Sequence, residues 1–189
     1  EYDLERIAIV DVDGHHGDGT QLILYDEPIL KISLHRYGIF PGTGSVEEIG
    51  KGSGHGYSVN IPLPGGCGDD LFMKAFNEVV PPLLAEYQPQ LLINQFGVDG
   101  HYQDPLVDLQ LTTFTYEEVA TTIHDLAHRL CGGRYLVLGG GGYEPRNVAR
   151  CWAIMFLTLL GRRASKEAGL SSLHDPEPTS SNEYERESE

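Results

Sequence analysis

Cysteine is scarce in this 189-residue sequence, and its arrangement excludes the roles of clustered cysteines. The three that occur, Cys67, Cys131 and Cys151, are far apart and form no CxxC pair. A disulfide framework requires an even, closely spaced set, and a thiolate zinc site requires paired cysteines. We therefore expect three reduced, packed thiols in a cytoplasmic protein.

Long apolar runs are also missing. Apolar runs such as 7–10 and 136–138 fall far short of the roughly 20 residues that a membrane-spanning helix needs. The first residues are polar and charged, so we expect no signal peptide and no membrane partner. Residue 1 is glutamate rather than methionine, which leaves a processed terminus and a start in mid-domain both open.

Basic residues are few: 13 Lys and Arg stand against 28 Asp and Glu, for a net charge of −15. Proteins that bind nucleic acid directly draw on Lys and Arg to contact its phosphates, so this class is not expected. The charge suits a cationic ligand, such as a lysine-rich segment or a polyamine, by long-range attraction, although solubility alone explains it equally well. The sequence gives no indication of the oligomeric state.

What the chain does contain is an alternation of strand and helix signals. Runs of β-branched and apolar residues predict strands at 6–12, 29–35, 57–61, 90–96 and 135–138. Helical patterns are found at 19–25, 69–87, 115–130 and 146–160. This order predicts an α/β fold, a three-layer sandwich whose mostly parallel sheet carries helices on both faces.

Local signals refine these elements. Asp18 and Thr115 are expected to cap the helices that begin near them, and a kink or break is expected at Pro81-Pro82. Residues 1–164 should form one domain. From residue 165 to 189 the chain is polar and rich in Ser, Pro and Glu, so we expect an acidic, disordered tail.

Polar residues follow three of the predicted strands. Asp13 and His15 follow the first, Asp99 follows the strand at 90–96, and Tyr143 follows the strand at 135–138 after four glycines. In an open parallel sheet, ligands collect beyond the carboxyl ends of the strands. Asp13, His15 and Asp99 would give a divalent metal one nitrogen and two carboxylates, which is typical of a catalytic zinc site. Iron and manganese remain open, and the Tyr143 hydroxyl is placed to donate to an oxyanion.

Four motifs strengthen this interpretation: DVDGHHGDGT, HRYGIFPGTG, GVDGHYQDPL and LGGGGYEPRNVARCW. In order and spacing they resemble motifs of the histone deacetylase superfamily. Within that superfamily they are similar to the prokaryotic acetoin-utilisation type. The resemblance runs from about Arg6 to Trp152. It implies an arginase/deacetylase-like fold that lacks the N-terminal strands, and hydrolysis of acetyl-lysine in proteins or of an acetylpolyamine.

The resemblance also implies roles for individual residues. Asp13, His15 and Asp99 match the family's zinc ligands, and Tyr143 matches the tyrosine that stabilises the tetrahedral oxyanion. Asp11 and Asp18 match the aspartates that orient two tandem catalytic histidines. A structural monovalent cation, K⁺, would lie at Asp11, Asp13, His15, Ser33 and Leu34. The tunnel for the acyl-lysine stem would involve Phe40, Gly141, Gly142 and His101.

One part of the family pattern is absent. The tandem histidines lie upstream of the DxDxHHGDG motif in that family, whereas this sequence has almost nothing upstream. We therefore expect the 189-residue chain alone to bind metal weakly and to turn over slowly or not at all. The sheet without its first strands should also expose an apolar edge and face.

Two other functions fit the sequence. A ureohydrolase of the same fold would bind two manganese ions, with Asp104 as an additional ligand, but would leave the GGGGY motif without a role. A catalytically inactive acyl-binding module would bind metal and ligand without turnover.

Overall fold

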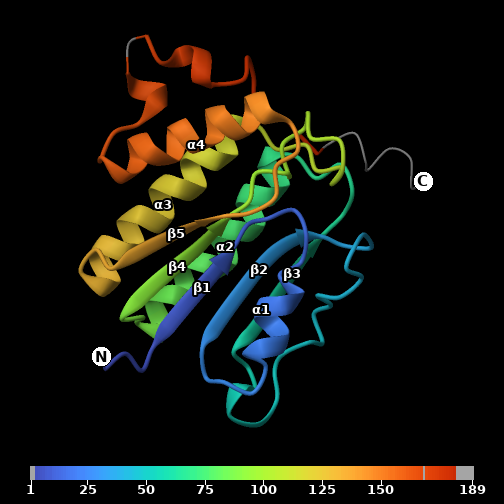
Figure 1. Ribbon diagram of the computed structural model, residues 1–189, viewed down its shortest axis with the longest axis vertical. Helices are drawn as coiled ribbons and strands as arrows, with labels where there is room; N and C mark the ends of the chain where they lie inside the picture. The colour runs from blue at the N-terminus through green and yellow to red at the C-terminus, as the bar shows by residue number, and fades with distance from the viewer. Residues whose placement is uncertain (1–2, 168, 182–189) are drawn as a thin grey trace.

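The computed structural model describes residues 3–167 and 169–181, and the fold rests on one parallel sheet (Figure 1). In the described residues the strand order is β3-β2-β1-β4-β5, and all pairings are parallel. The strands are β1 (Ile7–Asp11), β2 (Leu30–Arg36), β3 (Ser58–Leu63), β4 (Leu91–Phe96) and β5 (Tyr135–Gly139). The predicted α/β class and the five predicted strands are confirmed.

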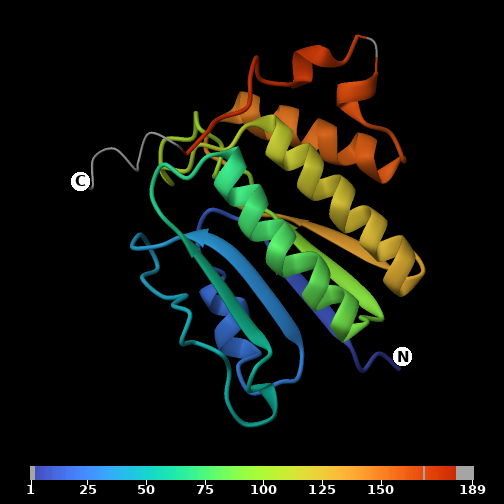
Figure 2. The same ribbon diagram turned by 180° about the vertical axis from the view of Figure 1, so that it is seen from behind.

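Helices cover the two faces of the sheet unequally. The helices are α1 (Asp18–Ile23), α2 (Asp69–Tyr87), α3 (Thr113–Cys131) and α4 (Pro145–Leu159). Helix α1 lies alone over β2 and β3, whereas α2, α3 and α4 lie behind the sheet, where α3 packs against both α2 and α4 (Figures 1 and 2). On β5, which is an edge strand, Leu136 and Leu138 are 46% and 43% exposed. An apolar edge is therefore open, as the sequence led us to expect.

The expected break at Pro81-Pro82 is wrong, because α2 continues through both prolines to Tyr87. Proline inside a helix removes a backbone donor and costs about 3 kcal/mol. Here the apolar stripe of α2 outweighs that cost, since its core-facing side chains are fully buried. They are Phe72, Phe76, Val80 and Leu84.

Both predicted helix caps are also wrong. Helix α3 begins at Thr113, and Thr112 is its N-cap, accepting the backbone N–H of Phe114. The Thr115 hydroxyl instead donates to the buried Asp69 carboxylate, which also receives the Thr112 hydroxyl. The N-cap of α1 is Gly17, and Asp18 is the first residue of the helix. The local sequence pattern predicted that Thr115 caps the helix, but its hydroxyl instead binds a carboxylate from a distant part of the chain.

Residues 169–181 belong to the tail that we expected to be disordered, but they make specific contacts with the rest of the chain. Asp175 is only 5% exposed and accepts hydrogen bonds from Thr113 and His101, and the Thr179 backbone N–H donates to Asp69. The composition predicts no apolar burial, but buried hydrogen bonds hold this segment instead. Residues 182–189 of the predicted tail lie outside the described residues.

The three cysteines are free and buried, as expected. Within the described part of the chain, no helix has the length and apolar character needed to cross a membrane.

Candidate metal centre

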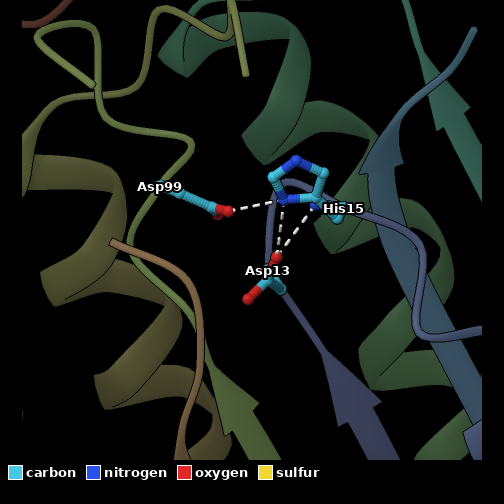
Figure 3. A group of neighbouring side chains, drawn as sticks. All are labelled: Asp13, His15 and Asp99. Carbon is cyan, nitrogen blue, oxygen red and sulfur yellow. Dashed lines mark hydrogen bonds and ion pairs between the residues drawn. The ribbon is translucent and has the colours of Figure 1, made fainter. Parts of the chain in front are cut away.

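Asp13, His15 and Asp99 meet at one point beyond the carboxyl ends of the strands (Figure 3). One ligand atom from each lies within 4.8 Å of the others. His15 Nδ1 is 2.7 Å from Asp99 Oδ2 and 3.4 Å from Asp13 Oδ1. The arrangement brings together residues that are 84 positions apart in the chain.

The sheet register explains why these residues converge. Asp11 at the end of β1 pairs with Gln95 of β4, and Phe96 pairs with Gly139 of β5. The three loops that follow β1, β4 and β5 therefore start side by side. Since these loops carry Asp13, Asp99 and the glycine run, their polar groups reach the same rim.

Hydrogen bonds hold each carboxylate so that one oxygen faces His15. Asp13 Oδ2 accepts the Gly141 N–H at 2.6 Å and the Gln95 amide at 3.0 Å. Asp99 Oδ1 accepts the Gly14 N–H at 2.7 Å. The remaining oxygens, Asp13 Oδ1 and Asp99 Oδ2, point toward the imidazole. Supporting bonds of this kind orient metal ligands.

Among the described residues, no Lys or Arg forms a salt bridge with Asp11, Asp13 or Asp99. Burial, followed by the charge of Asp13, raises the pKa of Asp99 to about 7. Burial raises the pKa of Asp11 to about 8, although the Asp13 backbone N–H opposes the shift. For Asp13, burial is outweighed by hydrogen bonds from Gln95 and from the backbone of His15 and Gly141, which lower its pKa. Closely spaced buried carboxyls of this kind favour a bound cation.

The donor set fits zinc. It offers one imidazole nitrogen and two carboxylate oxygens, and three protein ligands leave a coordination position for water or substrate. His15 is the most exposed of the three, with 21% of its side chain accessible, so solvent reaches the centre.

Glycines allow the close approach of the backbone to these carboxylates. A Cβ atom on Gly141 would lie 2.1 Å from Asp99 Oδ2, and one on Gly97 would lie 2.1 Å from Asp13 Oδ2. Gly142 has a φ of +152°, and a Cβ there would lie 2.7 Å from Val148 Cγ2. The glycine run thus makes room for the metal centre, and its place in the predicted tunnel stays a prediction.

Gly141→Ala should therefore lower the affinity for zinc by about 10-fold or more, because the added methyl group displaces a ligand carboxylate. Gly139→Ala is the matched control, since its Cβ would meet only Trp152, at an ordinary 3.6 Å. Competition with a chromophoric zinc chelator measures both affinities. Equal affinities for the two variants would contradict the role assigned to Gly141.

Two aromatic residues flank the centre. The ring centroids of Phe40 and Tyr143 each lie 6.4 Å from that of His15, and the two residues are 80% and 50% exposed. The backbone N–H of Tyr143 donates to Asp104 Oδ2 at 2.8 Å. Burial, and then the charges of Asp99 and Asp13, raise the pKa of the Tyr143 hydroxyl, which keeps it protonated. Both aromatic rings are therefore exposed to solvent beside His15.

The other predicted residues lie nearby. Asp11 is buried, its Oδ1 accepts the Asp13 N–H, and within the described residues it forms no salt bridge. Ser33, which precedes Leu34 on β2, pairs in register with Asp11 across the β1–β2 ladder. Asp18 is exposed at the start of α1. The roles of these residues with histidines or with K⁺ stay predictions.

His101 does not open toward the rim as a tunnel residue would. Its side chain is fully buried, and Nε2 lies 3.0 Å from Asp175 Oδ2. The histidine instead supports the loop from inside, because its partner lies on the C-terminal segment that the sequence predicted to be disordered.

From the sequence we did not identify Gln95 as a residue of the site, and we considered Asp104 only as an additional manganese ligand. Gln95 holds Asp13, and Asp104 holds the backbone of Tyr143. The available signal for Gln95 was a polar residue inside the apolar LLINQF strand. Gln95 is only half-buried, and its side-chain amide donates to the metal ligand Asp13.

Comparisons with known proteins agree with this geometry. The family model described as the histone deacetylase domain matches residues 1–159. The acetoin utilization protein AcuC of Bacillus subtilis is 44% identical over 160 residues, which cover 82% of this chain and 41% of that protein. A probable deacetylase of Archaeoglobus fulgidus is 41% identical over 174 residues, covering 92% of this chain and 47% of the relative.

Solved structures give the same result. The structure of the histone deacetylase Clr3 superimposes with a TM-score of 0.78 at 36% identity, covering 84% of this chain and 27% of that one. The HD domain of HDA15 gives a TM-score of 0.76 at 36% identity, with 85% and 47% coverage. The chain therefore spans less than half the length of these relatives.

Proposed function

Since the chain belongs to the histone deacetylase domain family, we propose that it carries the metal-binding part of a zinc-dependent deacetylase. The observation that carries the proposal is the convergence of Asp13, His15 and Asp99. The substrate would be the acetyl amide of a lysine side chain or of a polyamine, and the net charge of −15 favours either cation. The three buried, free thiols support a cytoplasmic location.

Each residue has a part in amide hydrolysis. A bound zinc ion would polarise the acetyl carbonyl and activate water. The Tyr143 hydroxyl donates a hydrogen bond to the carbonyl oxygen as it gains negative charge. Phe40, exposed beside His15, forms one wall of the tunnel that holds the lysine stem. Asp11 and Asp18 would orient the family's tandem catalytic histidines, which lie upstream of this motif and are not His15 and His16, and K⁺ would bind near Asp11 and Ser33.

An assay of acetyl-lysine peptide hydrolysis tests this proposal. The zinc-loaded 189-residue chain alone should be about 10²–10⁴-fold slower than a fusion that supplies the upstream part of the Bacillus subtilis relative, because the fusion restores general acid–base catalysis. Full activity of the chain alone would contradict the assignment of Asp11 and Asp18. A zinc-loaded fusion without turnover would favour the inactive acyl-binding module.

Zinc binding should release protons near neutral pH. The pKa of Asp99 is raised to about 7, so below that pH a proton competes with the metal for the carboxylate. Affinity should rise as the pH is raised from about 6 to about 8. Calorimetry in two buffers with different ionisation enthalpies measures the released protons. An affinity that stays constant over this range would contradict the raised pKa of Asp99.

A further inference from the structure

The C-terminal segment, residues 169–181, reaches the loop that carries Asp99. It runs back past α4 toward the loops beyond the sheet (Figures 1 and 2). We call residues 97–112, between β4 and α3, the Asp99 loop. Asp175 is the residue of the C-terminal segment that enters the interior, and it is 5% exposed.

Asp175 accepts hydrogen bonds from three elements of the fold. Its Oδ2 receives the Thr113 N–H and hydroxyl, both at 2.9 Å, and faces His101 Nε2 at 3.0 Å. Its Oδ1 receives Arg150 Nη2 of α4 at 2.9 Å. Four donors satisfy this one buried carboxylate, so its position is fixed relative to α3, α4 and the Asp99 loop.

The contact to His101 has a defined direction. The Gln103 backbone N–H donates to His101 Nδ1, so the proton of the neutral ring is on Nε2 and is donated to Asp175. The ring is stacked against Tyr102 and against Tyr116, with centroids 4.8 Å and 6.5 Å away. His101 therefore has one orientation, which Asp175 sets from outside the loop.

His101 in turn organises the groups of the metal centre. It lies two positions after Asp99, and its carbonyl accepts the Asp104 N–H at 2.7 Å. The Asp104 carboxylate then accepts the backbone N–H of Tyr143. Hydrogen bonds thus join the C-terminal segment, through His101 and Asp104, to the backbone of Tyr143, and the backbone itself joins His101 to Asp99 two positions before it.

We propose that Asp175 is a positioning residue for the metal centre, acting through His101 on Asp99 and, through Asp104, on Tyr143. The inference rests on the proposed function in that it takes Asp13, His15 and Asp99 as the ligands. It adds that the C-terminal segment is part of the functional unit. Loss of a partner that orients metal ligands typically costs 10–100-fold in metal affinity.

Titration of the 189-residue chain with Co²⁺, followed by visible absorption, tests this inference. Asp175→Asn should weaken Co²⁺ binding by about 10-fold or more. Arg150→Met is the matched control: it removes another partner of Asp175 without touching His101, so it should lower the melting temperature but change Co²⁺ affinity by less than about twofold. Amide exchange in the Asp99 loop should be faster in Asp175→Asn alone.

A second variant keeps the test decisive if Asp175→Asn folds poorly. His101→Phe keeps a buried ring but removes the donor to Asp175, so it should weaken Co²⁺ binding by a similar factor. The double variant should add no further loss, because both changes break the same path. If Asp175→Asn and His101→Phe bind Co²⁺ as tightly as the wild type, or if Arg150→Met loses as much Co²⁺ affinity as they do, this inference is overturned but the proposed function is not. A wild-type chain that binds no Co²⁺ would overturn the proposed function together with it.

Discussion

Asp99→Asn should lower the affinity of the chain for zinc by about 10²–10⁴-fold. With the roughly 10–16 kcal/mol of structural zinc sites in zinc-finger peptides as the scale, one of three ligands supplies on the order of 3–5 kcal/mol. Each 1.4 kcal/mol is a factor of about ten in affinity. The amide keeps the size of the carboxylate and an oxygen for the Gly14 N–H, but it lacks the charge that the metal requires.

Asp108→Asn is the control for this variant. Asp108 lies in the same loop, but 60% of its side chain is exposed and it pairs with Arg36, away from the ligands. Calorimetric titration with zinc should give wild-type affinity for Asp108→Asn. Retention of tight zinc binding by Asp99→Asn would mean that this carboxylate is not a ligand.

Tyr143→Phe should lower kcat by about 10²–10³-fold with little change in KM, because the lost hydroxyl donates mainly to the oxyanion of the transition state. The measurement uses the zinc-loaded fusion with the upstream part of the relative, in which general acid–base catalysis is restored. The backbone N–H of Tyr143 keeps its bond to Asp104, so the loop should be retained.

Phe40→Leu provides the contrast. It removes an aromatic side chain from the other side of His15, and its main effect should be on KM. A Tyr143→Phe variant with wild-type kcat would show that the hydroxyl does not stabilise the transition state, and would favour a binding role for this residue.

The sequence was sufficient to predict the rim of the site. Parallel strands that end in DVDGHH, FGVDG and LGGGGY deliver their polar groups to one edge, and the register of β1, β4 and β5 follows this order. The convergence of Asp13, His15 and Asp99 could therefore be inferred from strand alternation and from the resemblance to the family.

The supports of the site could not be predicted, because they depend on partners distant in sequence. Thr115 has the pattern of a cap, yet a buried carboxylate 46 residues away takes its hydroxyl. Asp175 lies in a stretch whose composition predicts disorder, and only its contacts with His101, Thr113 and Arg150 explain its burial. Composition measures apolar burial, whereas hydrogen bonds between distant segments hold these residues in place.

The assignment of Asp13, His15 and Asp99 as zinc ligands is tested by metal content after loading with zinc and manganese together, combined with X-ray absorption at the zinc edge. We expect one zinc ion per chain, bound by one imidazole and by carboxylate oxygens, and its loss in Asp99→Asn. Two manganese ions per chain would contradict the zinc assignment and would favour the ureohydrolase alternative. Zinc bound without an imidazole ligand would contradict the assignment of His15.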